Sequence, residues 1–433
     1  MPNLYDLLME EYCYFPLASD EIRLLELLPS DPESELHGKL EKFRLQESEE
    51  ITPEHEVLIT REGVDVPNAP PYEALSYTWG SLVNNKAASI KVLQGHKLCK
   101  LPITRNLHGS LARLRRELHN GQAKRLWVDA ICIHQSNIPE KNAQVRKMAM
   151  VYNRAKNVCV WLGNGDGDSR RAIDFIGKLL RLDDFDPLTQ DPGTESEWAA
   201  LNNLMQRPWF NRRWIVQEIS LARDAVLFCG DQSVSWHDFS AAVSLFAARH
   251  RDLRHLFQRS SEFHHHPNYL GEVEALGAKA LVDITSYLFR KSKEGVVLER
   301  LMSLEEVVST LTLFEAGSPH DIIYAVLWLA YDAEPDSKEH AAMSLEPNVR
   351  TPNQSPDLES VISSEDDRSL PNICLSPLPL ESPESTEGAK REEPQEQPRP
   401  GSRSTQYGEF LKPPHRKSRP TRSASDHSLR WMV

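Results

Sequence analysis

The segment from Arg207 to Ala222 carries indole, guanidinium and carboxylate side chains close together. Glu218 follows Trp214 by four residues, which places both side chains on one face of a predicted helix. A carboxylate in that position can stabilise an oxocarbenium ion or transfer a proton during glycosidic cleavage. The alternative is that Glu218 forms a structural ion pair with a nearby arginine. We also expect Glu218 to lie at the surface, where its removal would change stability little.

Three further candidates, Asp129, Cys132 and His134, lie within a nearly continuous apolar run over residues 125–135. Such a run is typical of a central strand that is covered on both faces. Alternation along a strand would put Cys132 and His134 on one face and Asp129 on the other. Because a buried cysteine without a nearby cation is normally inert, a Cys–His nucleophile is the less favoured alternative. We expect Asp129 and His134 to bind a ligand instead, because parallel sheets bind ligands at the carboxyl ends of their strands.

Residues 72–80 form a strand-length run that ends at Gly80. Small and hydroxylated residues near the carboxyl end of this run leave room for a ligand close to the backbone. We therefore predict that substrate contacts come from Ser76, Tyr77, Trp79 and Gly80.

The sequence offers no pattern for a bound metal or a recycled cofactor. The run His264-His265-His266 resembles a metal-binding tract only superficially, because adjacent histidines rarely converge on one ion without cysteine or carboxylate partners. Neither a G-x-G-x-x-G nor a P-loop pattern occurs, so dinucleotide reduction and NTP hydrolysis lack their usual phosphate-binding loop. We expect no metal and no resident cofactor.

The order of predicted elements favours an α/β fold. We expect a strand at 20–29, an irregular loop at 30–55 and a further strand at 56–60. Asn137 caps a later helix, with Glu140 completing a capping box, and a strand at 157–163 follows. Strand, helix and strand within about 40 residues predict a parallel crossover, and thus a doubly wound, mainly parallel sheet. Residues 236–332 are predicted to be mostly helical, with helices at 278–290 and 321–331.

Charge and composition limit the partners of the chain. Its 433 residues include 50 basic and 63 acidic side chains, a net charge of −13, which argues against nucleic-acid binding by the folded part. No apolar stretch is long enough to span a membrane, and we expect a cytoplasmic protein. Residues 335–433 hold 14 of the 29 prolines and predict a disordered tail. The basic end of the tail, 415–420, indicates nuclear import or an acidic partner, with a merely solvated tail as the alternative.

Three blocks of sequence together resemble the fungal heterokaryon-incompatibility (HET) domain. They follow the order and spacing of that family, and flanking features extend the resemblance over about 20–332. The resemblance implies a role in fungal non-self recognition, in which incompatible partners trigger programmed cell death after cell fusion. It also implies a protein partner. The blocks are 72–80, then 126–135 with 160–163, then 207–210 with 214–218.

A more distant resemblance connects residues 72–80 and the Trp214-x-x-x-Glu218 segment to Toll/interleukin-receptor (TIR) domains. It implies a flavodoxin-like fold and an NAD glycohydrolase in which Glu218 holds the nicotinamide-side ribose. Trp79 or Trp214 would stack on a ring, Arg213 would be a further binding residue, and NAD would be a substrate. The alternative is a non-catalytic TIR-like adaptor that acts by self-association, as a homo-oligomer, and by partner binding.

These predictions divide the chain into four parts. Residues 1–55 hold an N-terminal strand and an elaborated loop, and residues 56–245 hold the HET domain with a TIR-like α/β core. Residues 246–334 form a helical extension. Residues 335–433 form the disordered tail, which is rich in Pro, Ser and Glu and ends in basic residues.

Overall fold

The computed structural model of the chain describes residues 9–31, 33–45, 66–80, 88–118, 121–263, 265–266, 268–273, 276–293 and 295–333. All of these residues belong to one compact unit. The predicted strand at 56–60 and the predicted disordered tail at 335–433 lie outside the described residues. The described helices include none that is both long enough and apolar enough to cross a bilayer.

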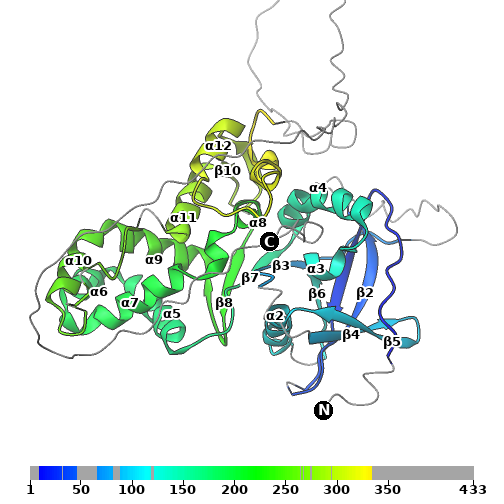
Figure 1. The fold of residues 1–433 in the computed structure, drawn as a ribbon, viewed down its shortest axis with the longest axis horizontal. Helices are drawn as coiled ribbons and strands as arrows, with labels where there is room; N and C mark the ends of the chain where they lie inside the picture. The colour runs from blue at the N-terminus through cyan, green and yellow to red at the C-terminus, as the bar shows by residue number, and fades with distance from the viewer. Residues whose placement is uncertain are drawn as a thin grey trace, which may run out of the picture. The chain divides into compact units, whose positions relative to one another are not determined.

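Nine strands of the described residues form one mixed sheet in the order β5-β4-β2-β1-β6-β3-β7-β8-β9 (Figure 1). Its centre, β6-β3-β7-β8, is parallel, whereas β1 pairs antiparallel with both β6 and β2. The predicted α/β class is confirmed, and the sheet is mixed, with four parallel strands at its centre. The strands are β1 Glu21–Leu27, β2 His37–Arg44, β3 Glu73–Tyr77, β4 Ala88–Gln94, β5 Lys97–Ile103, β6 Lys124–Trp127, β7 Asn157–Trp161, β8 Ala225–Cys229 and β9 Gln232–Ser235.

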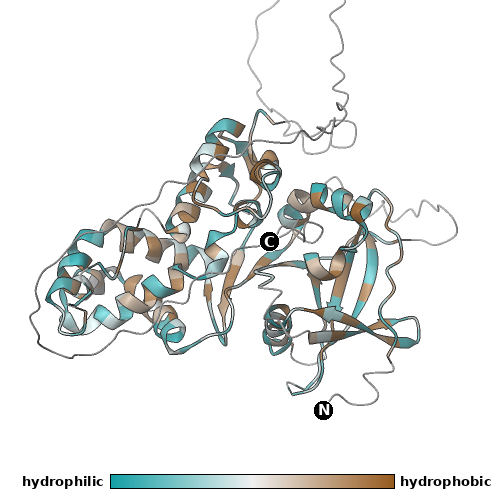
Figure 2. Cartoon of the chain, in the orientation of Figure 1, coloured by the Kyte–Doolittle hydropathy of each residue, from teal (hydrophilic) through white to brown (hydrophobic). Residues whose placement is uncertain are grey.

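The central strands are apolar because they are covered on both faces. β3 and β7 run in register from Glu73 opposite Asn157 to Tyr77 opposite Trp161. Trp127 at the end of β6 is fully buried and packs edge-on against Tyr152, with 5.6 Å between ring centroids. Figure 2 shows helices such as α4 banded in teal and brown, as expected of helices with one buried face.

Helix α4, Ile138–Arg154, connects β6 to β7. Its first turn is capped by the side chain of Asn137, which accepts a hydrogen bond from Glu140 N at 3.2 Å. β6 and β7 lie on either side of β3 and are parallel to it, so the predicted parallel crossover is confirmed. The other described helices are α2 Arg105–Arg115, α3 Asp129–Cys132, α5 Gly167–Leu179, α6 Leu182–Gln190, α7 Glu195–Met205, α8 Trp214–Ser220, α9 Trp236–Ala248, α10 His250–Arg259, α11 Gly277–Tyr287, α12 Leu304–Thr310 and α13 Asp321–Tyr324.

Short 3₁₀ helices and a small hairpin complete the described elements. The 3₁₀ helices are η2 Pro192–Thr194, η3 Pro208–Asn211 and η5 Leu327–Leu329. The hairpin pairs β10 Phe289–Lys291 with β11 Val297–Arg300. The predicted final helix at 321–331 is therefore wrong in extent, because α13 ends at Tyr324 and only a 3₁₀ turn follows.

Two local predictions are also wrong. The loop predicted at 30–55 contains β2, in which residues 38–44 pair with β1. A half-exposed strand can carry charged residues on its solvent-facing side. In β2 these charged residues obscured the alternation of apolar and polar residues that is typical of a strand. The strand predicted at 125–135 ends at Trp127 and gives way to the helical turn α3. Periodicity alone cannot distinguish a short buried strand from a buried helical turn.

A buried arginine connects the N-terminal strand to the start of α4. Arg23 is 1% exposed, and its guanidinium donates to both carboxylate oxygens of Glu140, at 2.6 and 3.1 Å, and to Cys132 O at 3.0 Å. Glu140 also accepts a hydrogen bond from His134 N at 2.9 Å, while Asn137 N donates to His134 O. The predicted capping box is therefore only half formed, because the Glu140 carboxylate holds Arg23 instead.

Replacing Trp127 with alanine tests the central position of β6. We expect the free energy of unfolding to fall by about 3–5 kcal/mol, because a large buried ring leaves a cavity. Chemical denaturation measures this loss. Leu98→Ala on β5 is the control, since that side chain is 44% exposed, and it should cost less than about 1 kcal/mol. An unchanged denaturation midpoint for Trp127→Ala would contradict the placement of β6.

Candidate functional site

Ser76 and Glu218 meet in the core at the carboxyl end of β3. Ser76 is the last residue but one of β3, and Glu218 lies in α8, 142 positions later. The Ser76 hydroxyl donates a hydrogen bond to Glu218 Oε2. Ser76 is 1% exposed and Glu218 is 3% exposed. The structure thus brings together two of the residues that the sequence nominated separately.

A third residue, Trp209, completes this group. It lies in η3, and its indole Nε1 donates to Ser76 Oγ at 2.8 Å. The ring is 1% exposed. Sequence analysis did not nominate Trp209, although the Arg-Pro-Trp-Phe run in which it lies was noted. The role of Trp209 depends on its contact with Ser76 of β3, and this contact is visible only in the folded structure.

Glu218 is a buried carboxyl group, so the expectation of a surface carboxylate is wrong. All seven residues of α8 are buried, because the helix is covered on every side. Burial raises the pKa of Glu218 to about 7, against the lowering effects of Arg212 and the Ser76 hydrogen bond. No ion pair joins Glu218 to an arginine among the described residues, which leaves the alternative of a structural ion pair without support.

A second buried carboxyl group, Asp129, lies close enough to raise the pKa of Glu218 further. Asp129 is 7% exposed and is the first residue of α3. Its Oδ2 accepts a hydrogen bond from Trp79 Nε1 at 3.0 Å, and its Oδ1 accepts one from Ala130 N at 2.7 Å. Burial raises the pKa of Asp129 as well, although these hydrogen bonds oppose the shift. Each carboxylate oxygen of Asp129 therefore already accepts a hydrogen bond.

Tyr77 and Arg212 lie near both carboxyl groups. Tyr77 is 2% exposed, and burial together with Asp129 raises its pKa well above the ordinary value. The Arg212 guanidinium donates to Tyr77 O, and its charge lowers the pKa of both Asp129 and Glu218. Arg212 is thus the cation of the site, where the sequence had nominated Arg213. Gly80 follows at the end of the same run with φ of 79°, a conformation that favours glycine.

Arg213 and Trp214 face the C-terminal extension. Arg213 is 2% exposed, and its guanidinium donates to the carbonyl oxygens of Leu311 at 2.7 Å and Ile322 at 2.9 Å. Trp214 is 4% exposed and lies beside Asp321. The backbone continues this attachment, since Arg213 N donates to Glu315 O at 3.0 Å. These contacts hold α8 in place from the side of the extension.

His134 lies in another group of residues. Its ring stacks on Tyr14, with 4.6 Å between ring centroids, and its Nε2 is 2.9 Å from Ser136 Oγ. Cys132 is buried, and burial raises the pKa of its thiol to about 12. A thiol of this kind is not a nucleophile near neutral pH, so the Cys–His alternative gains no support. The predicted strand alternation does not describe these residues, because Asp129 and Cys132 lie in the helical turn α3.

The part of the chain that the structure describes holds no group of three His, Cys, Asp or Glu side chains suited to a metal ion. His264, the first residue of the histidine run, lies outside the described residues.

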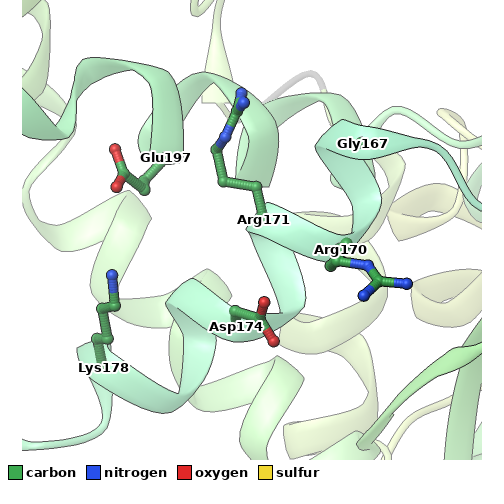
Figure 3. Close-up of a pocket in the computed structure, with 6 residues that line it drawn as sticks. All are labelled: Gly167, Arg170, Arg171, Asp174, Lys178 and Glu197. Atoms are coloured by element: carbon green, nitrogen blue, oxygen red, sulfur yellow. The ribbon is translucent and has the colours of Figure 1, made fainter.

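A separate cavity of about 310 Å³ is lined by residues of α5 and α7 (Figure 3). Lys178 and Glu197 lie on the same side of it, whereas Arg170 points away from them. Its three cations and two anions nearly balance, and none of its residues belongs to the group around Glu218. The lining residues are Gly167, Arg170, Arg171, Asp174, Lys178 and Glu197.

Known proteins resemble this chain over the residues that form the group around Glu218. The profile of the heterokaryon incompatibility protein (HET) family matches residues 72–218, from the start of the β3 run to Glu218. Heterokaryon incompatibility protein 6, OR allele, of Neurospora crassa is 28% identical over 305 residues, which cover 61% of this chain and 44% of that protein. The chain thus spans less than half the length of this relative. No solved structure matches the chain.

The family match begins and ends on the two segments that build the candidate site. β3 with Ser76 lies at its start, and α8 with Glu218 lies at its end. The chain is therefore similar to the HET family over residues 72–218, and to a heterokaryon incompatibility protein over a longer stretch.

Proposed function

We propose that this protein is an incompatibility-type effector of fungal non-self recognition, and that it kills the cell by cleaving the glycosidic bond of NAD or a related nucleotide. The observation that carries the proposal is the state of Glu218. One carboxylate oxygen is held by Ser76, and the other, Oε1, accepts no hydrogen bond from the described residues. A buried carboxyl group with one oriented and one available oxygen suits recognition of a sugar hydroxyl.

The proposed reaction breaks the bond between C1′ of the ribose and the nicotinamide nitrogen. The electron pair of this bond leaves with nicotinamide, which becomes neutral, and positive charge develops on the ribose. Glu218 accepts a hydrogen bond from a ribose hydroxyl and stabilises this charge electrostatically. Water then forms a new bond to C1′ and releases a proton. No redox step occurs, so NAD is a substrate and not a recycled carrier.

Glu218 is a better candidate than Asp129 for this role. Both oxygens of Asp129 already accept hydrogen bonds, from Trp79 and from Ala130 N. Asp129 therefore orients Trp79, which is partly exposed, and we expect its ring to stack on a base or a nicotinamide. Trp214 is 4% exposed and less available for stacking.

The position of the group supports a nucleotide ligand. In open α/β sheets, ligands bind at the carboxyl ends of parallel strands, and Ser76 and Tyr77 lie at that end of β3. A parallel centre of four strands is also consistent with the flavodoxin-like, TIR-like core that the sequence suggested. Because Glu218 is only 3% exposed, entry of a substrate requires movement of the residues that cover it.

A second candidate function is a non-catalytic adaptor that self-associates or binds a protein partner. The observation that favours it is a concentration of exposed apolar side chains in the C-terminal extension. Eight of the eleven large exposed hydrophobic residues in the described ranges lie between 287 and 331. Such exposure is typical of interaction surfaces. These eight are Tyr287, Leu298, Leu301, Leu313, Ile322, Ile323, Tyr324 and Tyr331.

Nicotinamide release from NAD by the purified chain tests the enzymatic proposal. We expect Glu218→Gln to reduce the rate at least about 100-fold, because the neutral amide cannot stabilise the developing charge. Chromatography of released nicotinamide at high protein concentration measures the rate. Glu305→Gln is the matched control, since Glu305 is an exposed residue in the first turn of α12, and it should retain full activity.

Two outcomes would contradict the proposal. Equal release by Glu218→Gln and the unmodified chain would show that Glu218 has no catalytic part. Absence of release under conditions in which the chain self-associates would favour the adaptor.

The raised pKa of Glu218 predicts a pH dependence of stability. Its ordinary pKa is 4.5 and its pKa in the folded chain is about 7, so the folded state holds the proton more tightly. The stability that this group contributes is full below about pH 4.5 and is lost as the pH rises through about 7. Between pH 5 and pH 8, Glu218→Gln should gain up to about 3 kcal/mol relative to the unmodified chain. Denaturation of both proteins across this range measures the difference, and parallel profiles would contradict the burial effect.

A further inference from the structure

A one-way chain of hydrogen bonds leads from Trp209 through Ser76 to Glu218. The indole nitrogen can only donate, and it donates to Ser76 Oγ at 2.8 Å. The serine hydroxyl has a single hydrogen, which it donates to Glu218 Oε2. All three side chains are at most 3% exposed, so water is a poor substitute for any of these partners.

We propose that Trp209 is a positioning residue for Glu218: its indole N–H fixes the Ser76 hydroxyl as a donor to Glu218 Oε2 and so leaves Oε1 to face the substrate. This inference deepens the proposed glycosidic cleavage and rests on it. Without the indole donor, the Ser76 hydroxyl is free to rotate its hydrogen toward another acceptor. Glu218 would then lose the contact that fixes its orientation.

The ring of Trp209 is itself fixed by its surroundings. It packs edge-on against Phe210 at 5.0 Å, and Phe210 stacks on Phe239 of α9 at 5.2 Å between ring centroids. α11 begins with Gly277 directly against this turn, where any side chain would collide with the carbonyl group of Phe210. The indole N–H therefore reaches Ser76 from a turn that has little room to move.

The chain of hydrogen bonds predicts how each variant changes the titration of Glu218. A donor to a carboxylate favours its charged form, so loss of the Ser76 hydrogen bond raises the pKa of Glu218. Trp209 acts only through Ser76. Its removal should therefore change the pKa of Glu218 in the same direction and by no more than removal of Ser76 does.

Carbon-13 NMR of labelled glutamate carboxyl groups in the full chain tests this prediction. The Glu218 signal is identified by its absence in Glu218→Gln. We expect Trp209→Phe to raise the pKa of Glu218 by about half to one pH unit, and Ser76→Ala to raise it at least as much. The double variant should match Ser76→Ala alone, because the two residues act as one unit.

Trp198→Phe is the matched control. Trp198 is also fully buried, but its indole donates to Leu188 O at 2.9 Å. It should leave the Glu218 titration unchanged. Equal effects of Trp209→Phe and Trp198→Phe, or additive effects of Trp209→Phe and Ser76→Ala, would overturn the proposal.

A second measurement keeps the test valid if Trp209→Phe does not fold. In the unmodified chain, the indole N–H signal of Trp209 should titrate with the same midpoint as the Glu218 carboxyl group. In Glu218→Gln this titration should disappear. A Trp209 indole signal that does not change with pH in the unmodified chain, or that titrates equally in Glu218→Gln, would overturn the proposal. These titrations need no turnover, so a chain that titrates as expected but releases no nicotinamide would count against the proposed function alone.

Discussion

A carboxyl group in the centre of an apolar core is the constraint on which the rest of the site depends. An isolated charge in such a place is costly, so the fold has to supply donors or keep the group protonated. Ser76 and Arg212 partly offset the cost of burying Glu218, whose pKa remains raised to about 7. The groups come from a strand, from the end of a 3₁₀ turn and from a short helix. The parallel centre of the sheet brings the strand to this point.

The family match ends at residue 218, yet the extension beyond it fixes the helix that carries Glu218. The Arg213 guanidinium donates to carbonyl groups of the extension, and Glu315 N donates to Asn211 O at 2.6 Å. Because Arg213 is buried without a carboxylate partner among the described residues, these carbonyl groups are what satisfy its hydrogen bonds. The segment that matches the HET family and the extension therefore pack together around α8.

Sequence patterns predicted most of the helices and strands. They also nominated some of the residues of the site, but not how these residues contact one another. The Asn137 cap indicated the start of α4, and the runs at 72–80 and 157–163 indicated the central strands β3 and β7. Glu218 and Ser76 were both nominated, but burial of the whole of α8 was not foreseeable from a seven-residue helix. Which of the two arginines, Arg212 or Arg213, lies near the carboxyl groups depends on the backbone between η3 and α8. Arg212 keeps an extended backbone with ψ of 136°, and the helix begins directly after Arg213, so the two side chains point to different neighbours.

The most direct test of the account is the structure of Glu218→Gln with NAD bound, because this variant should hold the substrate without cleaving it. The account predicts the nicotinamide-side ribose within hydrogen-bond distance of the residue 218 side chain, with a ring of NAD stacked on Trp79. NAD bound elsewhere on the chain, or no binding at millimolar concentration, would contradict a catalytic role for the group around Glu218.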